Sequence, residues 1–461
     1  MDPSDAHPTS SFSVARSLKL GSFHIGSAFA DILGSSLWNY TLANALTPLG
    51  AFSATPIALL LALRQLIAPL TMWAGHLSDT RPVLGYRRLP YIWIGRALML
   101  LSLPLLPVAT VQIVEGQALV GWGLALLASL AYGVGTQVSG SPFVALVRES
   151  APANRQGQAY AIVQTVLVGA FAFSPLVYAR LAAVLLPSLR LSESALRQST
   201  LDVFIAATGI GMTVAAVTWI FSVLGEERRE APRVAAAAKM PSQSPFLPAL
   251  REALSDPRAR AFFGLLALGA MSGFAQDGIF EPSLRQVFEL SFSAAATVTG
   301  VWGTGLLLGM VCAITATRRW PAARQTRVTA LGLSLAAFGL LMLATATATV
   351  QIGLLYPGVI VFGMGFGIYT AGGSPLLMVM TREGRAGLYV GVWSLAQLLF
   401  RGIGIALGGV LYDVFARLLN SQPAGYALVY ALEALGFLGA LILLRAARIG
   451  SWPSLQPAPS A

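Results

Sequence analysis

The chain has 461 residues, of which 56% are hydrophobic and only 11% are charged, and its mean hydropathy is +0.70. A soluble protein carries about 25% charged residues, so this composition excludes an ordinary soluble protein and predicts that lipid surrounds the chain. The net charge of +11 comes from Lys and Arg gathered in short connectors, without the basic and aromatic stripe of a nucleic-acid-binding protein. We expect no nucleic-acid partner, because an anionic membrane surface explains the basic bias.

A membrane-spanning helix needs about 20 mostly apolar residues, and the sequence predicts twelve such spans. The first six are expected at 18–44, 53–76, 89–112, 118–147, 157–186 and 201–224. The other six are expected at 260–285, 293–317, 326–348, 351–380, 386–416 and 425–447. The fold class is therefore an all-α polytopic membrane protein. Its first span is the least regular, since it contains His24, Asp31 and several Ser residues.

A charged, Pro-rich segment between the two groups of spans predicts two six-helix halves. The expected parts are an N-terminal tail at 1–17, a first half at 18–224, a central loop at 225–258, a second half at 259–448 and a C-terminal tail at 449–461. Many secondary transporters consist of two such repeats, with the binding site between them near the middle of the bilayer.

The distribution of Lys and Arg predicts the orientation. If the N-terminus is cytoplasmic, 22 Lys and Arg residues fall on the cytoplasmic side, five fall on the opposite side and three lie inside spans. Basic residues concentrate in cytoplasmic loops, so the central loop and both termini are expected to be cytoplasmic.

The connector after the second span reads GHLSDTRPVLGYRR over residues 75–88. With a short insertion, it resembles the G-x-L-x-D-R-x-G-R-R signature of major facilitator proteins. Gly75 and Gly85 permit close helix approach and unusual dihedrals, and Asp79 is expected to meet a helix N-terminus or an Arg. The alternative is a basic loop with a single charge pair. The conformational loop motif then consists of Gly75, Asp79, Arg81, Gly85, Arg87 and Arg88.

Four separated segments resemble the PucC-like, or bacteriochlorophyll delivery, family of the major facilitator superfamily. Residues 76–95, HLSDTRPVLGYRRLPYIWIG, are similar to the family pattern SDTHRSVLGWRRVPYIW. Residues 141–169, 273–303 and 387–413 resemble its fourth-to-fifth helix connection, its seventh-helix region and its eleventh helix. The chain departs from the pattern at Arg81, where His is usual, and at Ser283-Leu284-Arg285, where Tyr-Gly-Gly is usual.

This resemblance implies a non-enzymatic factor that binds or delivers (bacterio)chlorophyll for assembly of light-harvesting antenna complexes. The implied partners are the lipid bilayer, antenna polypeptides, reaction-centre or antenna assembly intermediates and pigment-synthesis enzymes. The implied location is the bacterial inner or intracytoplasmic photosynthetic membrane, and the pigment is cargo. The alternatives are a proton-coupled transporter of a small amphiphile and a pigment-free assembly scaffold. The sequence has no Walker loop, G-x-S-x-G, H-E-x-x-H or Cys cluster, so we expect neither catalysis nor a bound metal.

Ionisable residues inside spans are costly and usually face a cavity or a partner, which makes them site candidates. Asp277 and Glu281 are four residues apart and are expected on one helix face, with Pro282 kinking or ending the helix. Arg401 or Arg285 is the expected countercharge. The pair is interpreted either as a proton- or ligand-responsive site or as a structural pair.

The first half offers a corresponding set of candidates. Asp31 and Arg64 are expected to pair there, as a site or as a structural salt bridge. His24 is a pigment-ligand candidate because neutral imidazole binds the magnesium of a chlorin; the alternative is a hydrogen-bonded interfacial histidine. The substrate- or pigment-binding candidates are His24, Asp31, Asp277, Glu281 and Arg401.

Overall fold

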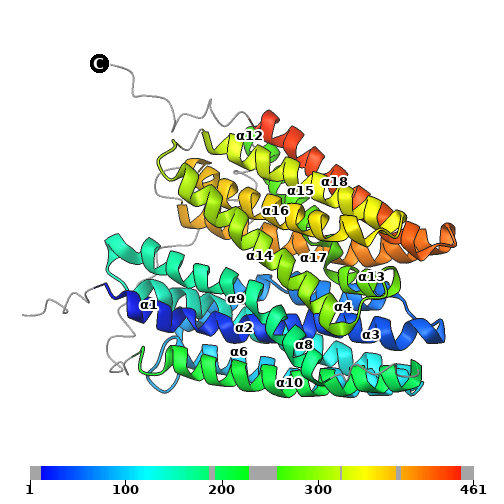
Figure 1. The fold of residues 1–461 in the computed structure, drawn as a ribbon. Coiled ribbons are helices and arrows are strands. Elements are labelled where there is room, and N and C mark those ends of the chain that lie inside the picture. The colour runs from blue at the N-terminus through cyan, green and yellow to red at the C-terminus, as the bar shows by residue number, and fades with distance from the viewer. Residues whose placement is uncertain (1–11, 186–192, 228–256, 322–323, 381–385, 448–461) are drawn as a thin grey trace, which may run out of the picture. The chain divides into compact units, whose positions relative to one another are not determined.

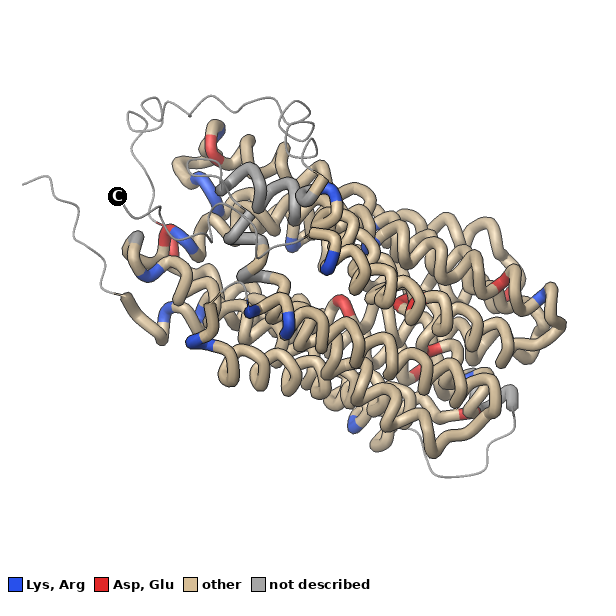
Figure 2. Tube along the Cα trace, turned by 90° about the horizontal axis from the view of Figure 1, so that it is seen from above, with Lys and Arg blue, Asp and Glu red and all other residues tan. Residues whose placement is uncertain are grey.

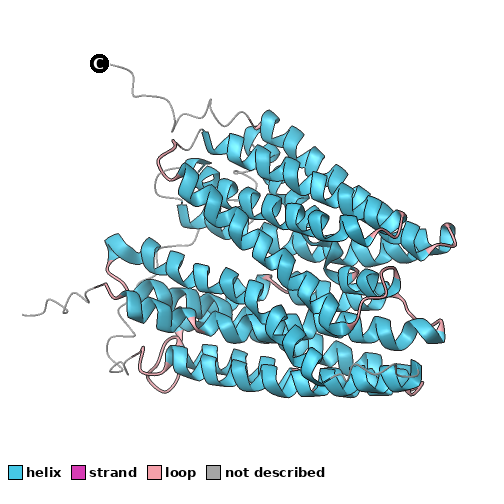
Figure 3. Ribbon diagram, in the orientation of Figure 1, coloured by secondary structure: helices cyan, strands magenta, loops and turns pink. Residues whose placement is uncertain are grey.

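A computed structural model describes residues 12–185, 193–227, 257–321, 324–380 and 386–447 of the chain. Helices and the loops between them make up this part (Figure 3), and the only strand-like pairing in it is an isolated bridge between Val83 and Tyr86. Most of the predicted central loop and of the two tails lies outside the described residues.

The helices follow one another along the chain as labelled in Figure 1. The earlier ones are α1 (Val14–Gly21), α2 (Phe23–Ile32), α3 (Trp38–Leu46), α4 (Ala54–Leu66), α5 (Pro69–Thr80), α6 (Leu89–Ser102), α7 (Leu105–Val114), α8 (Ala118–Glu149), α9 (Gln156–Leu185) and α10 (Glu193–Val223). The later ones are α12 (Pro257–Phe274), α13 (Phe280–Gln286), α14 (Phe292–Thr317), α15 (Gln325–Ala348), α16 (Ile352–Met380), α17 (Ala386–Leu418) and α18 (Gln422–Ala446).

Ten described helices are long and apolar enough to cross a membrane, or eleven if the bent pair Arg260–Gly278 and Phe280–Gln286 counts as one span. Each corresponds to a span predicted from hydropathy. The first predicted span is not among them, because α1, α2 and α3 divide it and the π-helical turn Leu33–Leu37 precedes α3. Figure 2 shows long uncharged stretches along the helices, with Lys and Arg mostly toward their ends.

The described helices group into two compact units. One unit comprises residues 1–34, 67–174 and 201–239, and the other comprises 35–66, 175–200 and 240–461. In the first unit, α6 packs closely against α8, since a Cβ on Gly95 would lie 2.5 Å from the Gly135 carbonyl oxygen. In the second unit, α16 packs against α14 and α15, and α15 packs against α18. Small residues at such contacts let helix backbones approach closely in lipid.

Candidate functional site

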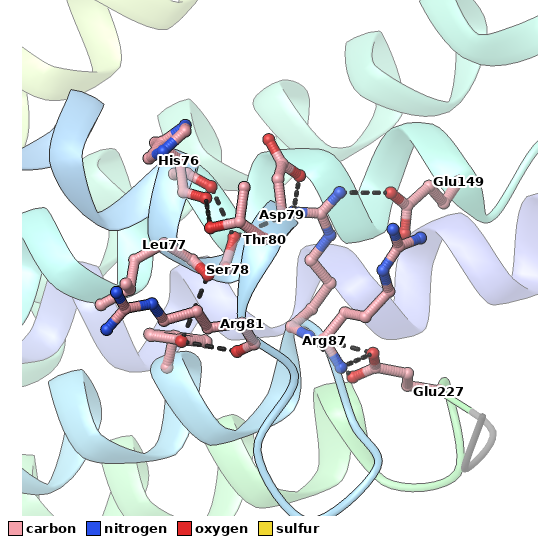
Figure 4. A network of polar contacts seen from close by, with 12 residues as sticks. His76, Leu77, Ser78, Asp79, Thr80, Arg81, Arg87, Glu149 and Glu227 are labelled. Atoms are coloured by element: carbon pink, nitrogen blue, oxygen red, sulfur yellow. Dashed lines mark hydrogen bonds and ion pairs between the residues drawn. The ribbon is translucent and has the colours of Figure 1, made fainter. Parts of the chain in front are cut away.

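The loop motif between α5 and α6 is organised by Arg88, which is 7% exposed. Figure 4 shows the motif, with Asp79, Glu149 and Glu227 among its polar side chains. Its guanidinium forms an ion pair with Asp79 and another, at 2.7 Å, with Glu149 of α8. A third bond, of 2.9 Å, goes to the Ser78 hydroxyl. Burial acts to lower the pKa of Arg88, but its bonds and charge interactions with Glu149 and Asp79 outweigh burial and raise that pKa. The cation therefore joins the end of α5 to the end of α8.

Glu227, which follows α10, caps the first turn of α6. Its carboxylate accepts hydrogen bonds from the backbone N–H groups of Arg87 at 2.6 Å, of Arg88 at 2.9 Å and of Leu89 at 2.8 Å. The N-terminus of a helix has free N–H groups and a partial positive charge, which favour a carboxylate there. Sequence reasoning expected Asp79 to meet either a helix N-terminus or an Arg. In the structure, Asp79 forms an ion pair with Arg88, and Glu227 binds the N-terminus of α6.

The glycines of the motif have the roles predicted for them. A Cβ on Gly75 would lie 2.5 Å from the Ser141 hydroxyl oxygen, so α5 and α8 lie close together at this glycine. Gly85 has φ of +81° and Leu84 has φ of +54° in a tight turn closed by the Val83–Tyr86 bridge. The side chain of Arg81 is exposed, and its carbonyl oxygen accepts a hydrogen bond of 2.7 Å from the Tyr91 hydroxyl.

His24 lies on α2 in an aromatic cluster of the first unit. Its ring packs edge-on against Phe23 and Phe143, with ring centroids 5.7 Å and 5.4 Å away. Phe23 and Phe143 are themselves stacked at 3.7 Å. Among the described residues, nothing forms a hydrogen bond with the His24 ring. A histidine nitrogen that no protein group occupies is able to bind a metal or a ligand.

Arg96 completes this cluster, although sequence reasoning noted it only as a charge inside a span. It is 6% exposed, and its guanidinium carbon lies 3.7 Å from the Phe23 ring centroid and 4.8 Å from that of Trp219. One of its nitrogens donates to Ser27 at 3.1 Å, but its Nε has no partner in the described part. Aromatic faces stabilise a desolvated guanidinium through cation–π attraction. We therefore define Phe23, His24, Arg96, Phe143 and Trp219 as the aromatic cluster.

Asp31 lies seven residues after His24 on α2, and hence on nearly the same helix face. Its expected partner Arg64 is 5% exposed on α4 and belongs to the other compact unit. Both residues have interactions of their own. The Asp31–Arg64 pair stays a prediction.

In the second unit, Asp277 and Arg401 form the ion pair that the sequence predicts, with 3.1 Å between their charged atoms. The Arg401 guanidinium also lies 4.1 Å from the ring centroid of Phe274. The two side chains remain 24% and 30% exposed, for Asp277 and Arg401 respectively. Arg285, the other predicted countercharge, instead donates to the side-chain oxygen of Asn44 at 2.7 Å.

The prediction that Asp277 and Glu281 share one continuous helix face is wrong. The helix breaks before Pro282 rather than at it: α12 ends at Phe274, a 3₁₀ turn (η5) covers Ala275–Gly278, and α13 starts at Phe280 with a bend of 41°. Pro282 lies in the first turn of α13, where its missing N–H costs nothing. Glu281 is 5% exposed and accepts a hydrogen bond of 3.1 Å from Thr299 of α14.

Two further carboxylates in the second unit were not among the predicted site residues. Asp413 of α17 accepts hydrogen bonds from the hydroxyls of Ser53 and Thr55 and from the backbone N–H groups of Ala54 and Thr55, at 2.5–3.0 Å. Glu433 of α18 is 3% exposed, and neither of its carboxylate oxygens has a hydrogen-bond partner in the described part. A lone acidic residue in an apolar span was the available signal for Glu433.

The chain is similar to known proteins in both sequence and structure. The model of a family described as PUCC protein matches residues 49–450. "Protein PucC" of Rhodobacter capsulatus is 26% identical over 405 residues, which cover 84% of this chain and 82% of that protein. A protein of the same species named "Bacteriochlorophyll synthase 44.5 kDa chain" is 26% identical over 388 residues, covering 80% and 83% of the two chains.

Solved structures of transporters share the fold. A bacterial homologue of the iron transporter ferroportin, in an inward-facing state, aligns with a TM-score of 0.66 at 14% identity, over 95% of this chain and all of that one. The D-xylose–proton symporter aligns with a TM-score of 0.63 at 16% identity, over 92% and 97% of the two chains. The chain is therefore an all-α multi-pass membrane protein with the major facilitator fold.

Proposed function

Because the chain belongs to the PUCC protein family, we propose that it binds (bacterio)chlorophyll in the membrane and delivers it for assembly of light-harvesting antenna complexes. The family match over residues 49–450 carries this proposal. The relative from Rhodobacter capsulatus whose name refers to bacteriochlorophyll supports it. We infer a carrier role without catalysis, since the family match comes together with a fold shared with transporters.

His24 is the residue that we propose binds the pigment magnesium. Its ring is fixed by Phe23 and Phe143 and has no hydrogen bond within the described part, so a nitrogen lone pair is free to act as an axial ligand. The aromatic rings around it offer flat apolar contact to a macrocycle. This arrangement favours the interpretation of His24 as a pigment ligand over the alternative of a hydrogen-bonded interfacial histidine.

The proposed cargo implies partners and a location. The pigment would pass from pigment-synthesis enzymes to antenna polypeptides or to reaction-centre and antenna assembly intermediates within the bilayer. We infer the bacterial inner or intracytoplasmic photosynthetic membrane, with both termini cytoplasmic. The split of 22 basic residues against five supports this orientation.

An absorption spectrum of the protein, purified in mild detergent from a pigment-producing host, tests the proposal. We expect a stoichiometric chlorin band, red-shifted from the free pigment, that is lost in His24→Ala. The matched control is His76→Ala, because His76 is exposed in the loop motif, and it should keep the band. A folded, monodisperse and colourless wild type would contradict pigment binding, whereas an unchanged band in His24→Ala would contradict only the ligand assignment.

The second candidate function is proton-coupled transport of a small amphiphile. The partly exposed Asp277–Arg401 ion pair favours it, because ionisable pairs inside spans often mark proton or substrate pathways. Uptake into vesicles driven by a pH gradient, and abolished in Asp277→Asn, is the expected result for this candidate. Amphiphile uptake that does not change with the pH gradient would contradict this function.

A further inference from the structure

The broken helix α12–η5–α13 is bordered by buried hydrogen-bond acceptors that lack donors. Gln276, in η5, is 5% exposed and donates to the Gly273 carbonyl at 2.8 Å, yet its side-chain oxygen has no partner in the described part. Asn39 of α3 is fully buried and donates to the Asp277 carbonyl at 2.8 Å. Its side-chain oxygen also has no hydrogen-bond partner in the described part. A buried acceptor without a donor is costly, so these oxygens favour a proton donor or a cation beside them.

Glu433 lies beside this break. Gly439 of α18 faces Leu268 of α12, and Gly436, one turn earlier on α18, faces Ser272, further along α12. The preceding turn of α18, which contains Glu433, therefore lies near the end of α12 and η5. Consistent with this register, α18 contacts η5 and α13, and Glu433 interacts electrostatically with Asp277. The carboxyl of Glu433 is thus buried in the second unit at the level of the break.

Among the described residues, the surroundings of Glu433 contain negative charge but no hydrogen-bond donor to its carboxyl. Asp277 is already paired with Arg401 of α17, which also packs on Phe274 at the end of α12. Glu281 of α13 is a second buried carboxyl, and Tyr430 of α18 hydrogen-bonds Ser283 at 2.9 Å rather than Glu433. Of the other helices packed against α18, α12 and α15 carry their charged residues only in their first turns. On α17, Asp413 binds the start of α4 and Arg417 lies in the last turn. No described group therefore compensates a negative charge on Glu433.

An isolated carboxylate buried in this way is strongly disfavoured, whereas the protonated acid is neutral. We propose that Glu433 is a proton-binding site of this protein, located beside the Asp277–Arg401 pair at the break between α12 and α13. Asp277, with its side chain 24% exposed, is the neighbouring carboxylate through which a proton reaches or leaves the buried acid. The site does not depend on the identity of the cargo, so it goes beyond the proposed function.

Infrared difference spectroscopy in H₂O and D₂O tests this proposal on the full-length protein in lipid nanodiscs. At pH 7 exposed carboxyls are ionised, so we expect a carbonyl stretching band of a protonated acid that shifts in D₂O. Glu433→Gln should lose the intensity of one carboxylic acid. The matched control Glu289→Gln should lose none, because Glu289 is exposed after α13. The same band in wild type and Glu433→Gln, or a band lost only in Glu281→Gln, would overturn the assignment.

Two further measurements distinguish proton binding by Glu433 from a structural charge and from binding of a metal cation. Glu433→Gln and Glu433→Met are neutral and similar in volume, so both should fold if the native carboxyl is neutral; loss of folding in both would show that a charge is required there. Replacing choline chloride with sodium chloride at constant pH should leave the band unchanged. A band abolished by sodium would show that the site binds a metal cation in place of the proton.

Discussion

Arg96 and Glu433 are both buried inside helices, and they are accommodated by different means. Arg96 lies over the rings of Phe23 and Trp219 and donates to Ser27. A guanidinium is delocalised and weakly hydrated, so aromatic faces replace part of its water. A carboxylate has no such alternative, and Glu433 has no donor among the described residues. Arg96 can therefore remain charged in its buried position, whereas we infer that Glu433 binds a proton.

At the same scale, Arg88 is the residue on which the loop motif depends most. Arg88→Gln removes bonds to Asp79, Glu149 and Ser78. Hydrogen bonds to charged groups contribute about 1.5–3 kcal/mol, and partial exposure of Asp79 and Glu149 reduces this. We expect a loss of about 1–2 kcal/mol, measured as a lower thermal unfolding midpoint in detergent. Arg81→Gln, at an exposed side chain, is the control, and an equal loss in both variants would contradict the role of Arg88.

Asp413 allows a similar prediction for the start of α4. Asp413→Ala removes four hydrogen bonds from the first turn of that helix, and loss of a helix N-cap costs about 0.5–2 kcal/mol. We expect faster hydrogen exchange at Ala54 and Thr55, measured by mass spectrometry. Exchange at the start of α18, which Ser421 caps, should stay unchanged. Unaltered exchange at α4 would show that the cap is dispensable.

At the scale of the elements, glycines set the distance between α14 and α16. A Cβ on Gly363 would lie 2.5 Å from the Trp302 carbonyl oxygen, whereas one on Gly373 of the same helix would meet nothing within 4 Å. Overpacking costs about 1–3 kcal/mol, so Gly363→Ala should lower the unfolding midpoint. Gly373→Ala should leave it unchanged or raise it slightly, because alanine favours a helix over glycine. A greater loss in Gly373→Ala would contradict this account of the packing.

Sequence patterns predicted the elements well where the determining forces are local. Length and apolarity define spans such as α15 and α18. The break before Pro282 was misplaced, because the 3₁₀ turn at Ala275–Gly278 has no local signature as strong as proline. The caps formed by Glu227 and Asp413 were missed because they join segments that are far apart in the sequence. Glu227 lies 140 residues after Arg87, and Asp413 lies 360 residues after Ser53.

At the scale of the whole molecule, hydropathy and charge bias predict how the chain crosses the membrane. In a Cys312→Ser background, we expect Asn420→Cys to be labelled from outside intact cells by a membrane-impermeant thiol reagent. Leu84→Cys, in the loop motif, should be labelled only after the cells are opened. Both positions are exposed, so burial does not confound the comparison. The opposite pattern would invert the proposed orientation.

The central claim is that this protein delivers (bacterio)chlorophyll to antenna complexes, and near-infrared absorbance of intact cells tests it most directly. The measurement compares a photosynthetic bacterium that encodes this chain with its deletion strain and with the complemented deletion. We predict that the deletion lowers the absorbance of assembled antenna relative to total extractable pigment, and that the wild-type chain restores it. Antenna absorbance that stays at the wild-type level in the deletion strain, with pigment content unchanged, would contradict the claim.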